Sequence, residues 1–295
     1  MTLPVSELHS LNLIPSLKRG ESEHKGNAGK VLLIGGAPGM AGAIVLAGKA
    51  ALHLGAGWTI LEMLDPASAH VIPEQAELMV RLASQDPQNQ LQLLDPDVIA
   101  IGPGLGQSRL AHQYLEAVLS YPKNTPLVID ADAINLLAED NKLMVLLQKR
   151  NQAFPGSSVL TPHPGEAARL LASNPDQVQE KRLESVAALV HLTQSIIVLK
   201  GHHTILASPI NSATQCMQGN PGMAAGGMGD ILTGSIAALA GQGISHHLNL
   251  WQATSIAVEL HATAADTLVD RQIGPIGLTP TETILEMRKL LNKLL

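Results

Sequence analysis

The stretch GNPGMAAGGMGDILTG, residues 219–234, holds six glycines, one proline and a single acid, Asp230, and runs directly into an apolar helical pattern. Glycines let backbone N–H groups converge on one point, and the N-terminus of the next helix adds a partial positive charge there. Such a point binds an anion. An acid in the first helical turn is suited to take a proton from an attacking hydroxyl, although Asp at this position also commonly caps a helix.

Composition excludes several classes of protein. The chain has 295 residues, a formal net charge of -6, 2% aromatic residues and one cysteine, Cys216. With no long basic cluster and few stacking side chains, we expect no nucleic-acid partner. One cysteine excludes an internal disulfide framework and a metal-thiolate cluster, and it fits a reducing compartment. The longest apolar stretch, residues 41–57, is interrupted by Lys49 and His53, so we expect no membrane span and a cytoplasmic protein.

Short apolar runs of strand length alternate with helical patterns along the first two thirds of the chain. Buried parallel strands have this appearance, and the alternation predicts an α/β fold whose sheet is covered on both faces. The predicted strands are residues 31–36, 58–64, 97–102, 126–130, 158–162 and 196–200. The predicted helices are residues 43–54, 110–119, 136–148, 165–171 and 177–192.

The pattern changes after residue 200. Residues 203–208 and 213–217 predict a short antiparallel pair, and helices follow at 231–239, 250–268 and 281–294. The Gln-rich segment 84–92 is interpreted as a surface loop. No repeat or linker interrupts the chain, so we assign one domain, residues 1–295, with residues 1–24 as an N-terminal extension. Ligands of open α/β sheets bind at the carboxyl ends of the strands, where the glycine and polar clusters of this chain lie.

Two further glycine clusters follow predicted strands. KGNAGKVLLIGGAPGMAGA, residues 25–43, matches neither the phosphate-binding P-loop nor the dinucleotide GxGxxG spacing, but its glycines favour close approach of a ligand to the backbone. IGPGLG, residues 101–106, forms either the floor of a substrate pocket or a tight turn between a strand and a helix.

Polar side chains cluster at two neighbouring strand ends. Asp130 and Asp132 close one strand, and His163 and Glu166 lie at the next strand-to-helix junction. Together they could hold Mg²⁺ through water or orient a substrate. The alternative is that Asp130 and Glu166 cap helices.

Lys200 ends an apolar strand and is followed by Gly201, so its ammonium group could reach a nucleotide phosphate, or it could be an ordinary solvated lysine. The neighbours His202 and His203 are expected to face opposite sides of a strand. The other histidines show no ligand spacing, so no zinc site is expected.

Seven segments along residues 25 to about 270 resemble, in the same order, the motifs of the ADP/ATP-dependent NAD(P)H-hydrate dehydratases of the ribokinase-like superfamily. These segments are HKGNAGKVLLIGG, GAGW, GPGLG, DADAIN, LTPHPGE, LKG and GNPGMAAGGMGDILTG. The resemblance implies a three-layer α/β/α sandwich around a central, mostly parallel sheet. It implies dehydration of the S-epimer of NAD(P)H hydrate to NAD(P)H, with Mg²⁺ and with ADP or ATP as co-substrate. It also implies a homotetramer in the stand-alone form of the family, paired with a separate NAD(P)HX epimerase.

The same resemblance assigns roles to matching residues. Asp230 matches the catalytic acid and a substrate ligand, and the N–H groups of Gly227, Met228 and Gly229 match the anion hole. The remaining assignments fall into two sets. The nucleotide-binding residues are Lys200, Gly201, His202, His203, Thr204 and Gly229, and the substrate-binding residues are Gly42, Ala43, Gly104, Leu105, Gly106, His163 and Asp230. Glu166 is a candidate Mg²⁺ ligand through water.

The chain departs from the family pattern at three places. Met228 and Ala225 stand where many members have hydroxyl residues, and HATAAD, residues 261–266, has alanines where the pattern has glycines, so this segment receives no role from the resemblance. The alternative function within this fold is a small-molecule kinase of the hydroxymethylpyrimidine or hydroxyethylthiazole type. A dinucleotide-dependent oxidoreductase is disfavoured by the missing GxGxxG order, and a non-catalytic nucleotide sensor would need the glycines but no base.

Overall fold

The computed structural model describes residues 5–70 and 75–295, so residues 1–4 of the expected N-terminal extension lie outside the described part. The strands of the described residues form one sheet in the order β1-β10-β9-β8-β7-β6-β5-β2-β3-β4. Strand β9 runs antiparallel to both of its neighbours, and all other pairs are parallel. The strands are β1 (Ser6–Glu7), β2 (Lys30–Gly35), β3 (Trp58–Met63), β4 (Met79–Leu82), β5 (Val98–Ile101), β6 (Leu127–Ile129), β7 (Ser158–Leu160), β8 (Ile196–Leu199), β9 (Ile205–Ala207) and β10 (Thr214–Gln215).

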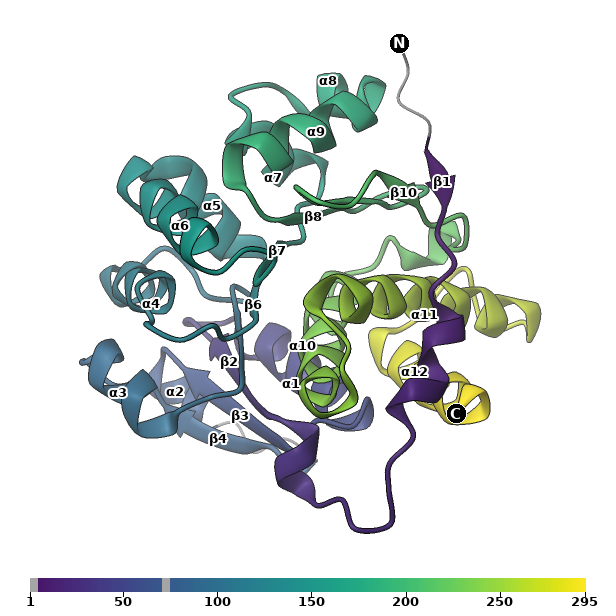
Figure 1. Ribbon diagram of the computed structural model, residues 1–295, viewed down its shortest axis with the longest axis horizontal. Coiled ribbons are helices and arrows are strands. Elements are labelled where there is room, and N and C mark those ends of the chain that lie inside the picture. The colour runs from purple at the N-terminus through teal and green to yellow at the C-terminus, as the bar shows by residue number, and fades with distance from the viewer. Residues whose placement is uncertain (1–4, 71–74) are drawn as a thin grey trace.

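Helices cover both faces of this sheet, as Figure 1 shows. The α-helices are α1 (Ala41–His53), α2 (Pro66–Ala69), α3 (Pro87–Leu94), α4 (Arg109–Leu119), α5 (Ala131–Glu139), α6 (Asn141–Ala153), α7 (Pro164–Leu170), α8 (Pro175–Glu180), α9 (Arg182–Thr193), α10 (Met228–His246), α11 (Leu250–Asp270) and α12 (Pro280–Leu294). Three short 3₁₀ turns complete the described elements: η1 (Leu11–Leu17), η2 (Lys25–Ala28) and η3 (Pro221–Met223).

Successive side chains of a strand point to opposite faces of the sheet, and this explains the arrangement of a central sheet between two layers of helices. In β2, Val31 and Leu33 join the core beneath α1, α10, α11 and α12, whereas Leu32 and Ile34 join the core beneath α4, α5, α6 and α9. A strand buried on both faces needs apolar residues at every position, which is why the strands appear in the sequence as continuous apolar runs. The predicted α/β/α architecture with a mostly parallel sheet is therefore confirmed, as is the antiparallel pair after residue 200.

Three sequence predictions of secondary structure were wrong, and two strands were missed. The segment 84–92 is not all loop, because Asp86 accepts a hydrogen bond from the Asn89 N–H and starts α3. The predicted helix 136–148 is two helices separated at Asp140, whose extended backbone and capping carboxylate begin α6. The predicted helix 177–192 likewise breaks at Lys181. Strands β1 and β4 were not predicted, because they are short edge strands with exposed side chains.

Two glycines of the opening stretch make the packing of α10 possible. Gly227 has a φ of +93° and precedes the helix as its N-cap, a conformation that other residues rarely adopt. A Cβ on Gly234 would lie 1.9 Å from the Ala47 carbonyl oxygen, so α10 and α1 touch backbone to backbone there. The first turn of α10 is thereby fixed over the carboxyl ends of the central strands.

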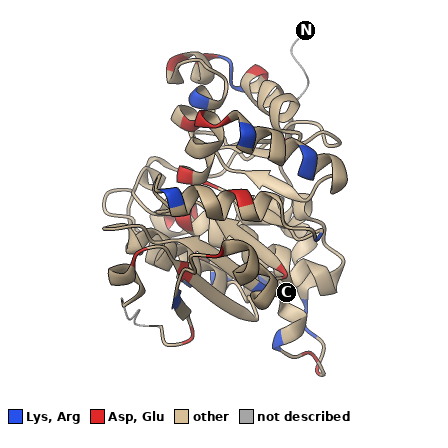
Figure 2. Cartoon of the chain, turned by 90° about the vertical axis from the view of Figure 1, so that its left-hand side faces the viewer, with Lys and Arg blue, Asp and Glu red and all other residues tan. Residues whose placement is uncertain are grey.

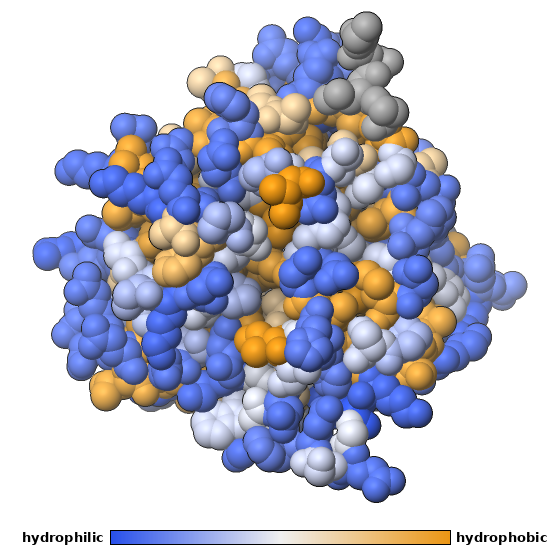
Figure 3. All heavy atoms as spheres, viewed as in Figure 1, coloured by the Kyte–Doolittle hydropathy of each residue, from blue (hydrophilic) through white to orange (hydrophobic). Residues whose placement is uncertain are grey.

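The charge and the hydropathy of the surface are described for one face each. On the face in Figure 2, Lys and Arg are interspersed with Asp and Glu rather than gathered by sign. On the face in Figure 3, apolar residues gather toward the middle and hydrophilic residues occupy the periphery. Among the described helices, none combines the length and apolar character that crossing a bilayer demands.

Candidate active site

Asp130, directly after β6, is the centre of the polar network. Its side chain is 1% exposed, and it accepts hydrogen bonds from Thr161 Oγ1 at 2.7 Å, Lys200 Nζ at 2.8 Å and Thr233 Oγ1 at 2.8 Å. These partners come from the ends of β7 and β8 and from α10. The alternative that Asp130 caps a helix holds only for its position, because Asp130 is the N-cap residue of α5 but its carboxylate makes no capping hydrogen bond. It joins three elements at the site instead.

Lys200 is not a solvated surface lysine. Its side chain is 19% exposed, and its ammonium lies 2.8 Å from Asp130 and 3.9 Å from Glu166. Burial alone would lower the pKa of Lys200, but the charges of Asp130 and Glu166 outweigh it and hold the pKa above its ordinary value. A Cβ on Gly229 would lie 3.2 Å from Lys200 Nζ, so the ammonium sits directly beneath the first turn of α10.

Asp230 lies in the first turn of α10, as predicted. Burial raises the pKa of its carboxyl group to about 6, with a further increase from Asp130 and an opposing decrease from Lys200. A carboxylate with this pKa is mostly ionised at neutral pH, yet it is a stronger base than an ordinary Asp. The geometry of the first turn therefore holds a base beside a cation and a helix N-terminus.

The backbone of this turn is partly engaged. The Met228 N–H donates to the Ala225 carbonyl oxygen over 3.3 Å, a long bond with which a phosphate oxygen could compete. The Met228 side chain is buried against Leu46 and Ile231 and contributes packing. Only its backbone is therefore suited to an anion.

His163 and Glu166 form a capping box at the start of α7. The His163 N–H donates to Glu166 Oε2 at 2.7 Å, and His163 Nδ1 accepts from the Gly165 N–H at 2.9 Å. The prediction of a helix cap at Glu166 is confirmed. Burial raises the pKa of Glu166 to about 7 against the lowering effect of Lys200, while burial and then Lys200 lower the pKa of His163.

The glycine loops meet on the same rim. Gly104 packs against the start of α1, where its Cβ would lie 3.2 Å from the Ala43 Cβ, and the Ala37 N–H donates to the Gly104 carbonyl at 2.7 Å. The Gly106 N–H donates to Asp132 at 2.8 Å. Gly42 has open space where a Cβ would be. Of the substrate-binding residues implied by the resemblance, Ala43 and Gly104 therefore lie side by side, whereas His163, the N-cap of α7, and Asp230 line the cavity described next.

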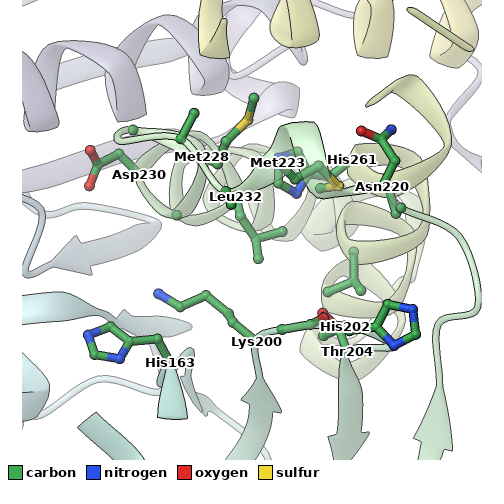
Figure 4. A pocket seen from close by; sticks show the side chains of 18 of the residues that line it. His163, Lys200, His202, Thr204, Asn220, Met223, Met228, Asp230, Leu232 and His261 are labelled. Atoms are coloured by element: carbon green, nitrogen blue, oxygen red, sulfur yellow. The ribbon is translucent and has the colours of Figure 1, made fainter. Parts of the chain in front are cut away.

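A cavity of about 660 Å³ lies between α10, α11 and the ends of β8 and β9. Figure 4 shows Asp230 and His163 at one end and His202, Thr204 and Asn220 at the other. Its lining includes all the predicted nucleotide-binding residues and Asp230, but not Gly42, Ala43 or residues 104–106. The rings of His202 and His203 lie 3.8 Å apart in a turn, so the prediction that they face opposite sides of a strand was wrong.

Several functional contributions were missed by sequence reasoning. Thr161 and Thr233 hold Asp130, and Asp266 accepts from the Gly219 N–H and from Asn220 Nδ2, both at 2.8 Å. The segment 261–266 therefore anchors the loop with which the glycine stretch begins. Thr233 could have been found from its position three residues after Asp230, which places both on one helical face. Thr161 and Asp266 carry no comparable sequence signal.

Comparison with known proteins identifies the family. Residues 31–288 match the family model described as NAD(P)H-hydrate dehydratase. The chain belongs to the NAD(P)H-hydrate dehydratase family. It is 36% identical over 279 residues to the ADP-dependent (S)-NAD(P)H-hydrate dehydratase of Neisseria meningitidis serogroup B, covering 94% of this chain and 89% of that protein. It spans about half the length of the bifunctional NAD(P)H-hydrate repair enzymes that it also matches.

Solved structures of NAD(P)H-hydrate dehydratases and their neighbours agree with the fold. The Bacillus subtilis ADP/ATP-dependent NAD(P)H-hydrate dehydratase, co-crystallised with ATP/Mg²⁺, superposes with a TM-score of 0.82 and 28% identity over 100% of both chains. A ribokinase-like superfamily protein of Enterococcus faecalis V583 gives a TM-score of 0.74 with 28% identity, covering 98% of this chain and 96% of that one. The chain has the α/β fold of these ribokinase-like proteins.

The described residues do not form a preformed Mg²⁺ site. In residues 5–70 and 75–295, no group of three or more His, Cys, Asp or Glu side chains is arranged to hold a metal ion. Both carboxylate oxygens of Asp130 already accept hydrogen bonds, and Glu166 is engaged with His163. Mg²⁺ usually binds through substrate phosphates and few carboxylates, so a nucleotide-bound ion needs no preformed carboxylate cluster.

Proposed function

We propose that this chain catalyses the dehydration of the S-epimer of NAD(P)H hydrate to NAD(P)H, using ADP or ATP. The observation that carries the proposal is the position of Asp230, a half-buried base at the N-terminus of α10, beside Lys200 and at one end of the large cavity. The family membership and the naming of the Neisseria meningitidis relative as ADP-dependent support the same reaction.

The chemistry follows from the poor leaving ability of hydroxide. Asp230 accepts the proton of the ring hydroxyl as the hydroxyl oxygen bonds to the terminal phosphorus of the nucleotide and the bridging oxygen leaves with the shorter nucleotide. Lys200 and the backbone N–H groups of Gly227 to Gly229 stabilise the charge on the phosphoryl group in transit. Phosphate then leaves with its bonding electron pair as the ring nitrogen supplies electrons. The neighbouring ring carbon gives up a proton to water, and the electrons of its C–H bond restore the double bond.

The substrate and nucleotide approach Asp230 from opposite sides in this proposal. The nucleotide occupies the cavity, with its phosphates toward Gly229 and its nucleoside toward Thr204. The hydrated dinucleotide lies along Gly42, Ala43, Gly104 to Gly106 and His163. The terminal phosphate of the nucleotide and the ring hydroxyl of the hydrated dinucleotide meet at Asp230 in this arrangement. One carboxylate can therefore act where the two ligands react.

A coupled absorbance assay tests the reaction. Hydrated NADH should regain the absorbance of the reduced nicotinamide when ADP or ATP is added, with release of inorganic phosphate. A kinase of the hydroxyethylthiazole type would consume nucleotide without restoring that absorbance, and this outcome would replace the proposal.

The proposal includes features that follow from the family resemblance. The nucleotide is used as its Mg²⁺ complex, residues 1–295 act as one domain, and the protein is a cytoplasmic homotetramer that works beside a separate NAD(P)HX epimerase. Light scattering of the purified protein tests the tetramer, and activity titrated against Mg²⁺ at fixed ADP tests the metal requirement.

A further inference from the structure

Helix α11 forms one wall of the cavity. Val258, His261 and Ala262 line it. In Figure 4, His261 lies across the space from Thr204 and His202. Figure 4 shows His261 beside Met223 and Asn220, at a distance along the pocket from Asp230. The segment 261–266 therefore contributes His261 to the cavity wall and Asp266 to the anchoring of the Gly219 loop.

His261 is an unexplained polar group in this wall. The residue is 6% exposed, and its Nε2 has no hydrogen-bond partner among the described residues. Buried polar atoms are nearly always paired, because leaving one unpaired forfeits the hydrogen bond it made with water. Burial, and then the charge of Lys200, lower the pKa of His261 to about 4, so the ring is neutral at pH 7.

The position and the neutral charge of the His261 ring indicate which part of a bound nucleotide it would contact. The charged groups of the site, Lys200 and Asp230, lie toward the end where phosphoryl transfer is proposed. Around His261 the lining is uncharged and includes Asn220, Met223 and Val258. A neutral imidazole in such surroundings suits a ribose hydroxyl or a ring nitrogen of the base better than a phosphate.

We propose that His261 is a nucleotide-binding residue that hydrogen-bonds the nucleoside half of the bound adenine nucleotide. The inference rests on the proposed function, because it requires the cavity to hold that nucleotide. It assigns a role to the segment 261–266, for which the sequence pattern supplied none. The contact accounts for a buried polar ring that lines the cavity together with the apolar Val258 and Ala262 of the same helix.

Calorimetric titration of the purified protein with ADP tests the proposal. His261→Phe keeps the shape of the ring and removes both nitrogens, so ADP should bind about tenfold more weakly, the effect of one lost hydrogen bond. Tripolyphosphate, which has no nucleoside, should bind the variant and the unaltered protein equally. Equal ADP affinity in a folded variant, or an equal loss for both ligands, would overturn the proposal.

Two further arms complete the experiment. Ser255→Ala is the matched control, because Ser255 lies on the same helix, is buried with an unpartnered Oγ and is absent from the cavity lining; its ADP affinity should not change. Inosine diphosphate and 2′-deoxy-ADP identify the partner atom, because His261→Phe should stop discriminating against the analogue that lacks it. Nucleotide binding without NADH recovery would refute the dehydratase proposal alone.

Discussion

At the scale of single residues, the proposed reaction makes its heaviest chemical demand on Asp230, because that reaction needs its carboxylate ionised and facing the phosphoryl group. Asp230→Asn keeps the shape and removes the base, so we expect turnover to fall by about 10²–10⁴-fold, the usual contribution of a positioned base. ADP affinity should stay nearly unchanged. Steady-state kinetics and calorimetry measure the two quantities, and unaltered turnover would remove Asp230 from the role of base.

Lys200 opposes the effects of burial and of Asp130 on the pKa of Asp230, and so it influences the pH dependence of the proposed base. With a pKa of about 6, Asp230 loses its charge as the pH falls, so kcat/KM of the unaltered enzyme should decline below about pH 6. The Lys200 charge lowers the pKa of Asp230 and thereby favours the carboxylate. Lys200→Met should move this acid limb to higher pH, in addition to weakening nucleotide binding more than hydrate binding.

A matched variant separates this effect from general damage to the site. Lys49, on α1, is outside the cavity lining and is not among the groups that shift the pKa of Asp230. Lys49→Met should therefore leave the acid limb in place. An acid limb that does not move in Lys200→Met would show that Lys200 does not act on the ionisation of Asp230.

At the scale of elements, the sequence predicted the strands of the sheet centre well and the helix boundaries less well. The central strands are buried on both faces, and this produces unmistakable apolar runs such as residues 31–34. The break at Asp140 depends on a local capping bond inside a pattern that otherwise continues, and the helix start after Asp86 lies in a segment rich in glutamine. Edge strands such as β4 lack the apolar run altogether.

The site was predicted to a similar degree. Asp230 and Lys200 could be predicted from local sequence patterns. Asp230 follows a glycine-rich helix start, and Lys200 is a charged residue at the end of an apolar strand. The hydrogen bonds around Asp130 have no such local pattern. Thr161 and Thr233 lie 31 and 103 residues from Asp130 in the sequence, and only tertiary structure brings them to it. The position of His261 could not be predicted either, because the sequence pattern of a long helix does not show whether a histidine lines a cavity or lies in the core.

The contact between α1 and α10 gives a prediction about stability. A side chain on Gly234 would collide with the Ala47 backbone oxygen at 1.9 Å, which cannot move without displacing α1. Gly234→Ala should therefore lower the free energy of unfolding by about 1–3 kcal/mol or more, the usual cost of overpacking. Gly226→Ala is the control, because nothing lies within 4 Å of its added Cβ. Urea denaturation measures both, and equal midpoints would contradict the close packing.

At the scale of the whole molecule, one buried carboxylate ties the beginning of the described chain to α11. Glu259 Oε2 accepts hydrogen bonds from Ser10 Oγ at 2.7 Å and from the Leu11 N–H at 3.2 Å, as well as from the Ser10 N–H. These bonds place η1 against α11, and they fix the segment from which β1 pairs with β10. A contact across about 250 residues thus closes one edge of the molecule.

Removing this carboxylate should loosen the N-terminal segment without affecting the polar network around Asp130. In Glu259→Ala the buried donors of Ser10 lose their acceptor, which should lower the free energy of unfolding by about 1–3 kcal/mol. Amide hydrogen exchange at residues 6–17 should accelerate, whereas exchange around Asp130 should not, because local opening is confined to the elements that lose their contacts. Glu259→Gln, which retains one acceptor oxygen, should have a smaller effect. Acceleration spread evenly over the sheet would mean instead that Glu259 supports the entire fold.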